Sequence, residues 1–123
     1  GLEKTELKDM NIKQENLQAV LEGMKSVTTE SGGTANSFFR GFDIEVGGKT
    51  GSAEVGNGKV NAWFAGFAPY EDPEIAVVVM VENGKHGSYT AEPVRDIIAE
   101  YFGMNLQEAQ ESMEAIPTVQ VQR

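Results

Sequence analysis

Three strand-like runs separated by short turns constrain the fold of this chain more than any other feature. They cover residues 45–55, 61–69 and 75–82. The turn Gly56-Asn57-Gly58 separates the first two runs, and residues 70–74 separate the second from the third. Five of the eight residues in the third run are β-branched, which strongly favours a strand. Because turns this short join neighbouring antiparallel strands, the sequence predicts an antiparallel meander.

An amphipathic helix is predicted on each side of the three runs. The first spans 13–28, and its apolar side chains recur at helical spacing: Leu17, Val20, Leu21, Met24 and Val27. The second spans 91–102, with Pro93 in its first turn and Gly103 as its stop signal. Its expected apolar stripe consists of Val94, Ile97, Ile98, Tyr101 and Phe102. Residues 34–43 contain three phenylalanines without a clean period, and we expect a buried connecting loop or short extended piece there.

These elements predict an α+β fold, in which two helices cover a three-stranded antiparallel sheet. A chain of 123 residues with 40% hydrophobic residues suits one compact unit. We assign residues 1–103 to this unit and 104–123 to a polar tail, expected to be mobile with a short helix near 106–113. The chain begins Gly-Leu-Glu-Lys, which is not a signal peptide, and we expect it to be a piece of a longer protein.

Composition excludes several functional classes. The net charge of −9 argues against a nucleic-acid partner. With no cysteine, the chain has no disulfide, no thiolate metal site and no cysteine nucleophile. His86 is the only histidine, and no Asp/Glu cluster with ligand spacing lies near it, so we expect a solvated loop residue, no metal site and no cofactor. No run reaches the ~18–20 apolar residues that a membrane span requires.

The chemistry of the chain is concentrated in Lys49, Thr50, Gly51 and Ser52. On a strand, Lys49 and Gly51 face one side while Thr50 and Ser52 face the other. A glycine-rich edge strand leaves main-chain groups open, so a peptide could dock there as an added strand. Lys49 would offer a cation and the two hydroxyls would offer donors to an incoming carboxylate, while a main-chain N–H near Ser52 could stabilise an oxyanion.

A phosphate-binding loop is the competing interpretation of Gly48-Lys49-Thr50. That motif requires glycine five positions before the second glycine, but Asp43 stands there. The motif also leads into a helix, whereas a strand-like Ser-Ala-Glu follows here. The sequence therefore disfavours nucleotide binding.

Lys-Thr-Gly on an edge strand is the third signature of the serine acyltransferases that include penicillin-binding proteins and serine β-lactamases. Its Ser-Ala-Glu continuation, the Ala-Trp-Phe-Ala-Gly-Phe-Ala-Pro run at 62–69 and the upstream Gly32-Gly33-Thr34-Ala35 add to the match. Residues 12–103 thus resemble the C-terminal part of the transpeptidase domain of a class B penicillin-binding protein. The resemblance implies a peptidoglycan D,D-transpeptidase that cross-links stem peptides by serine acyl transfer. It also implies a parent anchored in the bacterial cytoplasmic membrane, with this domain outside.

The resemblance further implies roles for the four residues. Lys49 would set the electrostatics around the reacting serine and the substrate carboxylate. Thr50 would hydrogen-bond that carboxylate, which belongs to the terminal D-alanine of a stem peptide or to the ring of a β-lactam. Gly51 would permit close approach, and the Ser52 N–H would be one of two oxyanion-hole donors. The Ser52 hydroxyl would also reach the carboxylate.

The chain departs from the family in two motifs. It has neither the Ser-x-x-Lys that supplies the nucleophile nor the Ser-x-Asn that assists proton transfer, and both lie upstream in the family. We therefore expect this chain alone to be inactive and to need the remainder of the transpeptidase domain as a partner. The face that meets that remainder is expected to promote self-association. Two alternatives stay open: a serine β-lactamase or D,D-carboxypeptidase relative, and a non-enzymatic peptide-binding module that uses the edge strand.

Overall fold

The computed structural model describes residues 9–84, 86–105, 107 and 111. Its first elements are the helices α1 (Gln14–Thr29) and α2 (Asn36–Phe39), followed by the strands β1 (Gly47–Gly56), β2 (Lys59–Ala68) and β3 (Ile75–Val81). A short 3-10 helix, η1 (Gly87–Thr90), leads into α3 (Ala91–Tyr101). This order confirms the predicted α+β fold. Most of the predicted polar tail, 104–123, lies outside the described residues.

The sheet is the predicted antiparallel meander, with strand order β1-β2-β3. Asn57 and Gly58 form the turn between β1 and β2 with φ angles of 52° and 70°, the left-handed backbone that this hairpin turn requires. In the register of the sheet, Trp63 on β2 lies opposite Gly51 on β1 and Met80 on β3. Within the described residues β1 pairs only with β2, so it is an edge strand as predicted.

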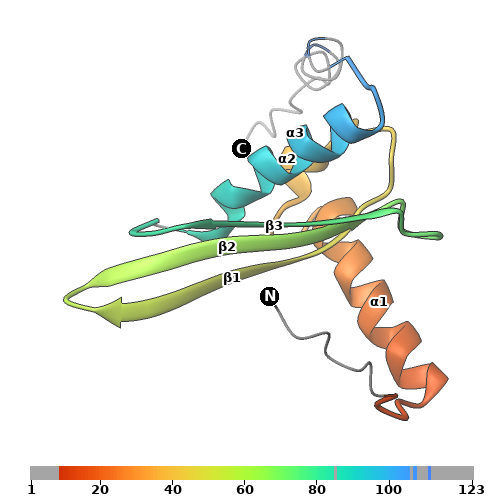
Figure 1. Ribbon diagram of the computed structural model, residues 1–123, viewed down its shortest axis with the longest axis horizontal. Helices are drawn as coiled ribbons and strands as arrows, with labels where there is room; N and C mark the ends of the chain where they lie inside the picture. Colours follow the sequence, from red (N-terminus) through yellow and green to blue (C-terminus); the bar gives the residue numbers. More distant parts are fainter. Residues whose placement is uncertain (1–8, 85, 106, 108–110, 112–123) are drawn as a thin grey trace, which may run out of the picture.

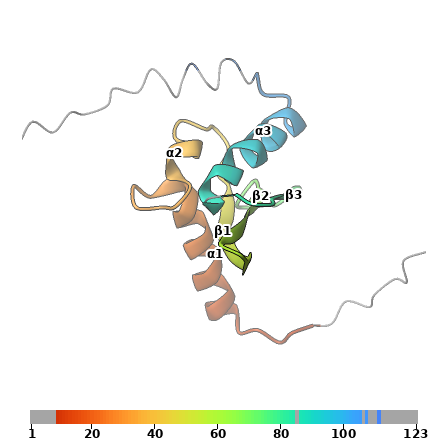
Figure 2. The same cartoon turned by 90° about the vertical axis from the view of Figure 1, so that its left-hand side faces the viewer.

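The helices lie on both sides of the sheet (Figure 1). η1 and α3 cover one face, and α2 lies beside α3 and above α1, with its Phe39 ring 5.9 Å from that of Phe64 on β2. α1 contacts β1 and projects to the other side (Figure 2). The core lies between the sheet and the α2–α3 layer, where the largest fully buried side chains meet. These are Phe64, Ile98, Val46 and Val94. Their removal from water supplies the main stabilisation of this layer. In the part of the chain described here, no helix is long and apolar enough to cross a bilayer.

The predicted apolar stripes of the two long helices are only partly correct. Leu17 and Val20 of α1 are exposed, because the N-terminal half of the helix extends past the sheet. In α3, Ile97 and Tyr101 are exposed as well. Positions 91, 94, 95, 98 and 99 form the buried face instead, and it includes Arg95. Ile97 and Tyr101 lie one turn apart beside this face, so apolar spacing alone placed the stripe too far round the helix.

The end of α3 follows the prediction closely. Gly103 adopts a φ of 66°, which glycine reaches without a Cβ penalty. Its N–H donates to the Glu100 carbonyl at 3.0 Å, and the Met104 N–H donates to the Ala99 carbonyl at 2.8 Å. This pair of bonds is a Schellman motif and satisfies carbonyls that the helix end would otherwise leave open.

The prediction of a loop or extended piece over 34–43 is wrong in one respect. Residues 36–39 form the helix α2, which is too short to show a helical period in the sequence. The Asn36 side chain donates to the Thr28 carbonyl at 3.1 Å, and Phe39 is buried in the core. Contacts with α1 and the core thus determine the local structure here.

Candidate functional site

The register of β1 places its polar side chains on two different faces. Thr50 and Ser52 lie opposite Phe64 and Ala62, both buried, so they belong to the face that α3 covers. Lys49 lies opposite Ala65 and belongs to the outer face. The predicted alternation along this strand is therefore confirmed.

The Thr50 and Ser52 side chains border a hollow of about 310 Å³. Its lining combines hydroxyl-bearing residues with glycines: Thr34, Thr50, Gly51, Ser52, Gly87 and Ser88. The Thr34 and Thr50 hydroxyl oxygens lie 3.0 Å apart and share a hydrogen bond. The Gly87 N–H donates to the Ser52 hydroxyl oxygen at 3.2 Å. A hollow of this composition can donate several hydrogen bonds to an anionic group.

Gly51 lies where other parts of the chain press against β1. A Cβ at this position would lie 1.9 Å from Nε1 of Trp63, so the indole ring occupies the space that a side chain would need. A Cβ on Gly87 would in turn lie 2.3 Å from the Gly51 carbonyl oxygen. Internal packing therefore requires glycine at both positions, whereas the sequence suggested only the approach of a ligand.

Lys49 is exposed and does not line the hollow. Its Nζ donates to the Thr50 carbonyl at 2.7 Å. Within the described residues no carboxylate forms an ion pair with Lys49. The ammonium group is therefore available to an anion that reaches the edge of β1.

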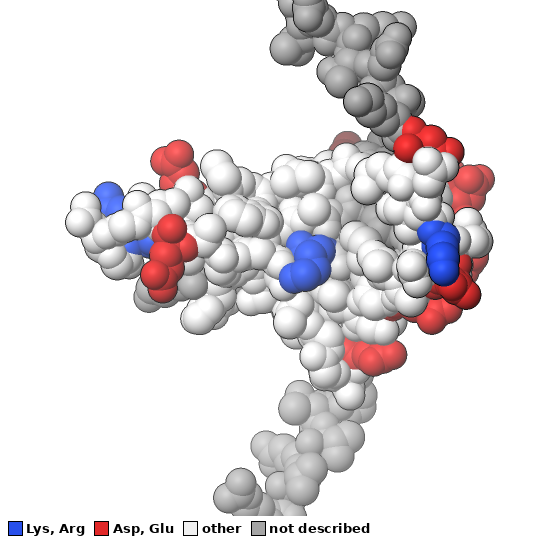
Figure 3. Space-filling view, turned by 90° about the horizontal axis from the view of Figure 1, so that it is seen from below, with Lys and Arg blue, Asp and Glu red and all other residues white. Residues whose placement is uncertain are grey.

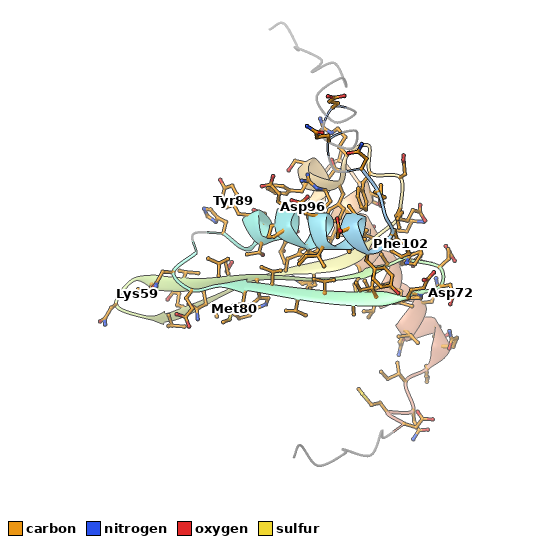
Figure 4. The ribbon with its side chains drawn as sticks, turned by 45° about the horizontal axis from the view of Figure 1, so that its top comes forward. Lys59, Asp72, Met80, Tyr89, Asp96 and Phe102 are labelled. Carbon is orange, nitrogen blue, oxygen red and sulfur yellow. The ribbon has the colours of Figure 1, made fainter. Side chains whose placement is uncertain are left out.

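Aromatic side chains gather around the start of α3. The Tyr89 ring lies 6.3 Å from that of Phe38 and 6.4 Å from that of His86. Figure 4 shows Tyr89 at the N-terminal end of α3, on the helix-covered side of the sheet. His86 is exposed, as predicted for a loop residue. Among the residues that the structure describes, no group of His, Asp or Glu could hold a metal ion.

Sequence reasoning did not assign a role to three residues that line the hollow: Thr34, Gly87 and Ser88. Thr34 is 16 positions from Thr50, and Gly87 is 35 positions from Ser52. Neither separation corresponds to a helix or strand period that could be recognised in the sequence. Tertiary packing, and not local structure, brings these residues to β1. The Gly-Gly-Thr-Ala match was the one sequence feature that pointed to Thr34.

The fold and the hollow define a class of protein: an α+β sheet with a hydroxyl-lined site along an edge strand that carries Lys-Thr-Gly. The family model for the penicillin binding protein transpeptidase domain matches residues 2–100. Among curated proteins, the peptidoglycan D,D-transpeptidase MrdA of Haemophilus influenzae is 31% identical over 100 residues, which cover 69% of this chain and 15% of that protein.

Solved structures give the same result. Pseudomonas aeruginosa PBP2 in complex with WCK 5153 is 35% identical, with a TM-score of 0.65 over 84% of this chain and 22% of that one. The PBP2 in a complex with MreC from Helicobacter pylori is 32% identical, with a TM-score of 0.66 over 82% and 20% of the two chains.

The chain belongs to the penicillin-binding protein transpeptidase domain family and corresponds to part of a class B transpeptidase domain. It spans about 15% of the length of its Haemophilus influenzae relative. The β-lactamase, carboxypeptidase and binding-module alternatives are not favoured by these relatives.

Proposed function

We propose that this chain forms the carboxylate-binding and oxyanion-binding wall of a peptidoglycan D,D-transpeptidase. In that reaction a serine attacks the D-Ala–D-Ala peptide bond, D-alanine leaves, and an amine of a neighbouring stem peptide resolves the acyl-enzyme. The observation that carries the proposal is the hollow beside β1, in which the Thr50 and Ser52 hydroxyls lie together.

The Thr50 and Ser52 hydroxyls are assigned to the carboxylate of the acyl donor. They project from the same face of β1 two residues apart, so both can donate to one carboxylate. Lys49 contributes a positive charge at the same stretch of strand, although its side chain lies on the other face. Charge and hydroxyl donors thus combine to select a substrate with a free C-terminal carboxylate.

The Ser52 N–H is assigned to the oxyanion hole. In an antiparallel strand the N–H and C=O of one residue point to the same side, and the side alternates from residue to residue. The Thr50 carbonyl accepts a bond from the Lys49 side chain, which supports an orientation of that carbonyl toward the free edge of β1. By alternation, the Ser52 N–H then faces the same edge and can donate to the developing oxyanion.

The remainder of the transpeptidase domain is assigned to the outer face of the sheet. Val78 and Met80 on this face are 69% and 54% exposed. Met80 points away from α3 in Figure 4, and Figure 3 shows mainly uncharged atoms in the view from below, with one basic group near the middle and charged groups of both signs toward the ends. The chain spans a small part of its relatives, so the remainder of the domain supplies the natural cover for these side chains. The remainder also carries the serine that is acylated.

We further propose that the complete protein is anchored in the cytoplasmic membrane with this domain outside.

The proposal is tested by labelling the complete transpeptidase with a fluorescent penicillin and measuring the label retained after denaturation. We expect labelling of the wild type, and a loss of at least ~100-fold in labelling rate for Lys49→Met, because a preorganised charge near the reacting groups contributes several kcal/mol. Lys59→Met is the matched control, because Lys59 lies at the tip of the β1–β2 hairpin (Figure 4).

The isolated 123-residue chain should retain no label, because it lacks Ser-x-x-Lys. An unlabelled complete protein, or a Lys49→Met variant that reacts at the wild-type rate, would contradict the proposed function.

A further inference from the structure

Thr34 is the residue of the hollow that lies outside β1 and contacts its motif through a side chain. Its hydroxyl oxygen lies 3.0 Å from that of Thr50. The segment that carries it joins α1 to α2. Nothing in the Lys-Thr-Gly motif itself requires a second threonine at this place, so the contact calls for a physical explanation.

The main chain on both sides of Thr34 is fixed to α1. The Gly33 N–H donates to the Glu30 carbonyl at 2.8 Å, and the Ala35 N–H donates to the Val27 carbonyl at 3.0 Å. Ala35 is fully buried in the core. Thr34 is exposed, yet its position relative to β1 is set by α1 and by the core.

The chemistry of a bound carboxylate determines the direction of the Thr34–Thr50 hydrogen bond. A hydroxyl has one proton to donate and two lone pairs to accept, whereas an ionised carboxylate only accepts. If Thr50 donates its proton to the carboxylate, its hydroxyl oxygen can bond Thr34 only as an acceptor. The bonds then run in one direction, from Thr34 to Thr50 to the carboxylate, and each polarises the next.

Ser52 has the same arrangement. Its hydroxyl oxygen accepts the Gly87 N–H at 3.2 Å, which leaves its own proton free to donate into the hollow. With a carboxylate bound, each hydroxyl that β1 offers to it is thus oriented by a donor from another element, the Thr34 side chain in one case and the main chain of η1 in the other.

We propose that Thr34 is a positioning residue for carboxylate recognition. By donating to Thr50 it orients the Thr50 hydroxyl toward the carboxylate of the acyl donor. This inference rests on the proposed function. It predicts a specific defect: loss of the Thr34 hydroxyl should weaken reaction with donors that carry a carboxylate and spare donors that lack one.

The test compares the wild-type complete transpeptidase with Thr34→Val, which removes the hydroxyl, and Thr34→Ser, which retains it. Second-order acylation rate constants are measured with a penicillin and with its methyl ester, in which the ring carboxylate is neutral. We expect Thr34→Val to slow reaction with the penicillin by about 10-fold and to change reaction with the ester less than about twofold. Thr34→Ser should stay within about twofold of wild type for both.

A double-mutant cycle with Thr50→Val tests whether Thr34 acts through Thr50. If it does, Thr34→Val in the Thr50→Val background should change the penicillin rate constant by less than about twofold. If Thr34→Val lowered the rate constants for the penicillin and the ester equally, the inference would be overturned. It would also be overturned if the double variant lost the product of the two single-variant factors, because the two residues would then act independently.

Thermal unfolding of each variant checks its folding, and Thr34→Ala replaces Thr34→Val if the valine variant does not fold. A wild-type protein that does not react with penicillin contradicts the proposed function itself, whereas a reactive Thr34→Val variant contradicts only the positioning role.

Discussion

Gly51 combines two roles at a single residue, because it belongs to the candidate site and also packs against Trp63. The indole of Trp63 lies over one side of its main chain, and Gly87 approaches its carbonyl oxygen. The motif glycine therefore contributes to the stability of the β1–β2 pair, whatever ligand approaches the edge of β1.

Gly51→Ala should lower the free energy of unfolding of this chain by about 1–3 kcal/mol, because a methyl group would overlap the Trp63 ring. Urea denaturation measures the change. Gly23→Ala is the control in α1, where the added methyl group would meet no side chain and no other element within 4 Å among the described residues beyond its chain neighbours, and it should stabilise the chain by ~0.5–1 kcal/mol. Equal stability of the Gly51→Ala variant and the wild type would show that Trp63 does not pack as described.

Lys25 links α1 to the segment before β1. Its Nζ lies 2.8 Å from Oε2 of Glu45 and 4.9 Å from the centre of the Tyr70 ring. The hydrogen bond to the Glu45 carboxylate is the main cause that raises the pKa of Lys25 above its ordinary value of 10.5. A raised lysine pKa means that the folded state favours the charged form, so this stabilisation is complete below pH 10.5 and is lost as the pH rises through the folded-state value.

The melting temperature of the wild type should therefore exceed that of Lys25→Met at neutral pH, and the difference should shrink at a pH of about 11 or above. Thermal unfolding at the two pH values checks this. A difference that grows at alkaline pH would contradict the sign of the pKa shift.

At the scale of elements, Thr28 joins the end of α1 to the start of β1. Its hydroxyl donates to the Val46 carbonyl at 2.6 Å, and the side chain is 3% exposed. Thr28→Val should cost about 1–3 kcal/mol of unfolding free energy, because it leaves a buried carbonyl without this donor.

Thr29→Val is the matched control for Thr28→Val. Thr29 is the adjacent residue and is exposed, and within the described residues its hydroxyl bonds only the Lys25 carbonyl of its own helix. Thr29→Val should change the free energy of unfolding by no more than ~0.5 kcal/mol. Denaturation of both variants under one set of conditions gives the comparison, and equal costs would mean that the bond to Val46 does not connect the two elements.

The elements with a strong local signal were the predictable ones. The Asn57-Gly58 turn and the β-branched run of β3 led to the correct meander, and Gly103 led to the correct end of α3. α2 was missed because four residues carry no helical period, and its position depends on contacts with Thr28 and the core. Arg95 was likewise not expected on a buried helix face, where it bonds the Asp96 carboxylate at 2.6 Å and the Phe38 carbonyl at 3.3 Å.

The candidate site was predictable only along its own strand. Alternation placed Thr50 and Ser52 on one face and Lys49 on the other, because a strand has a period of two. The contributions of Thr34 and Gly87 depend on how α1 and η1 pack against β1, and no spacing in the sequence encodes that packing.

At the scale of the whole molecule, the two faces of the sheet differ in cover. One face is packed against η1 and α3, while Val78 and Met80 remain exposed on the other. Exposed apolar side chains that lie together promote association between molecules. The isolated chain should therefore self-associate through this face.

Val78→Lys should raise the dissociation constant for self-association of the isolated chain by about 10-fold, because the lysine charge would be buried in the contact between molecules. Ile97→Lys is the control, because Ile97 is exposed on α3, on the covered side of the sheet. Analytical ultracentrifugation measures both. In the complete transpeptidase, Val78→Lys should instead lower the melting temperature, since the proposed cover lies over this residue.

The central claim is that β1 binds the carboxylate and the reacting carbonyl of an acyl donor. A crystal structure of the complete transpeptidase domain after reaction with a penicillin tests it most directly. We predict the ring carboxylate within hydrogen-bond distance of the Thr50 and Ser52 hydroxyls, with the acyl oxygen at the Ser52 N–H. A penicillin acyl group bound with its carboxylate away from β1 would contradict the account.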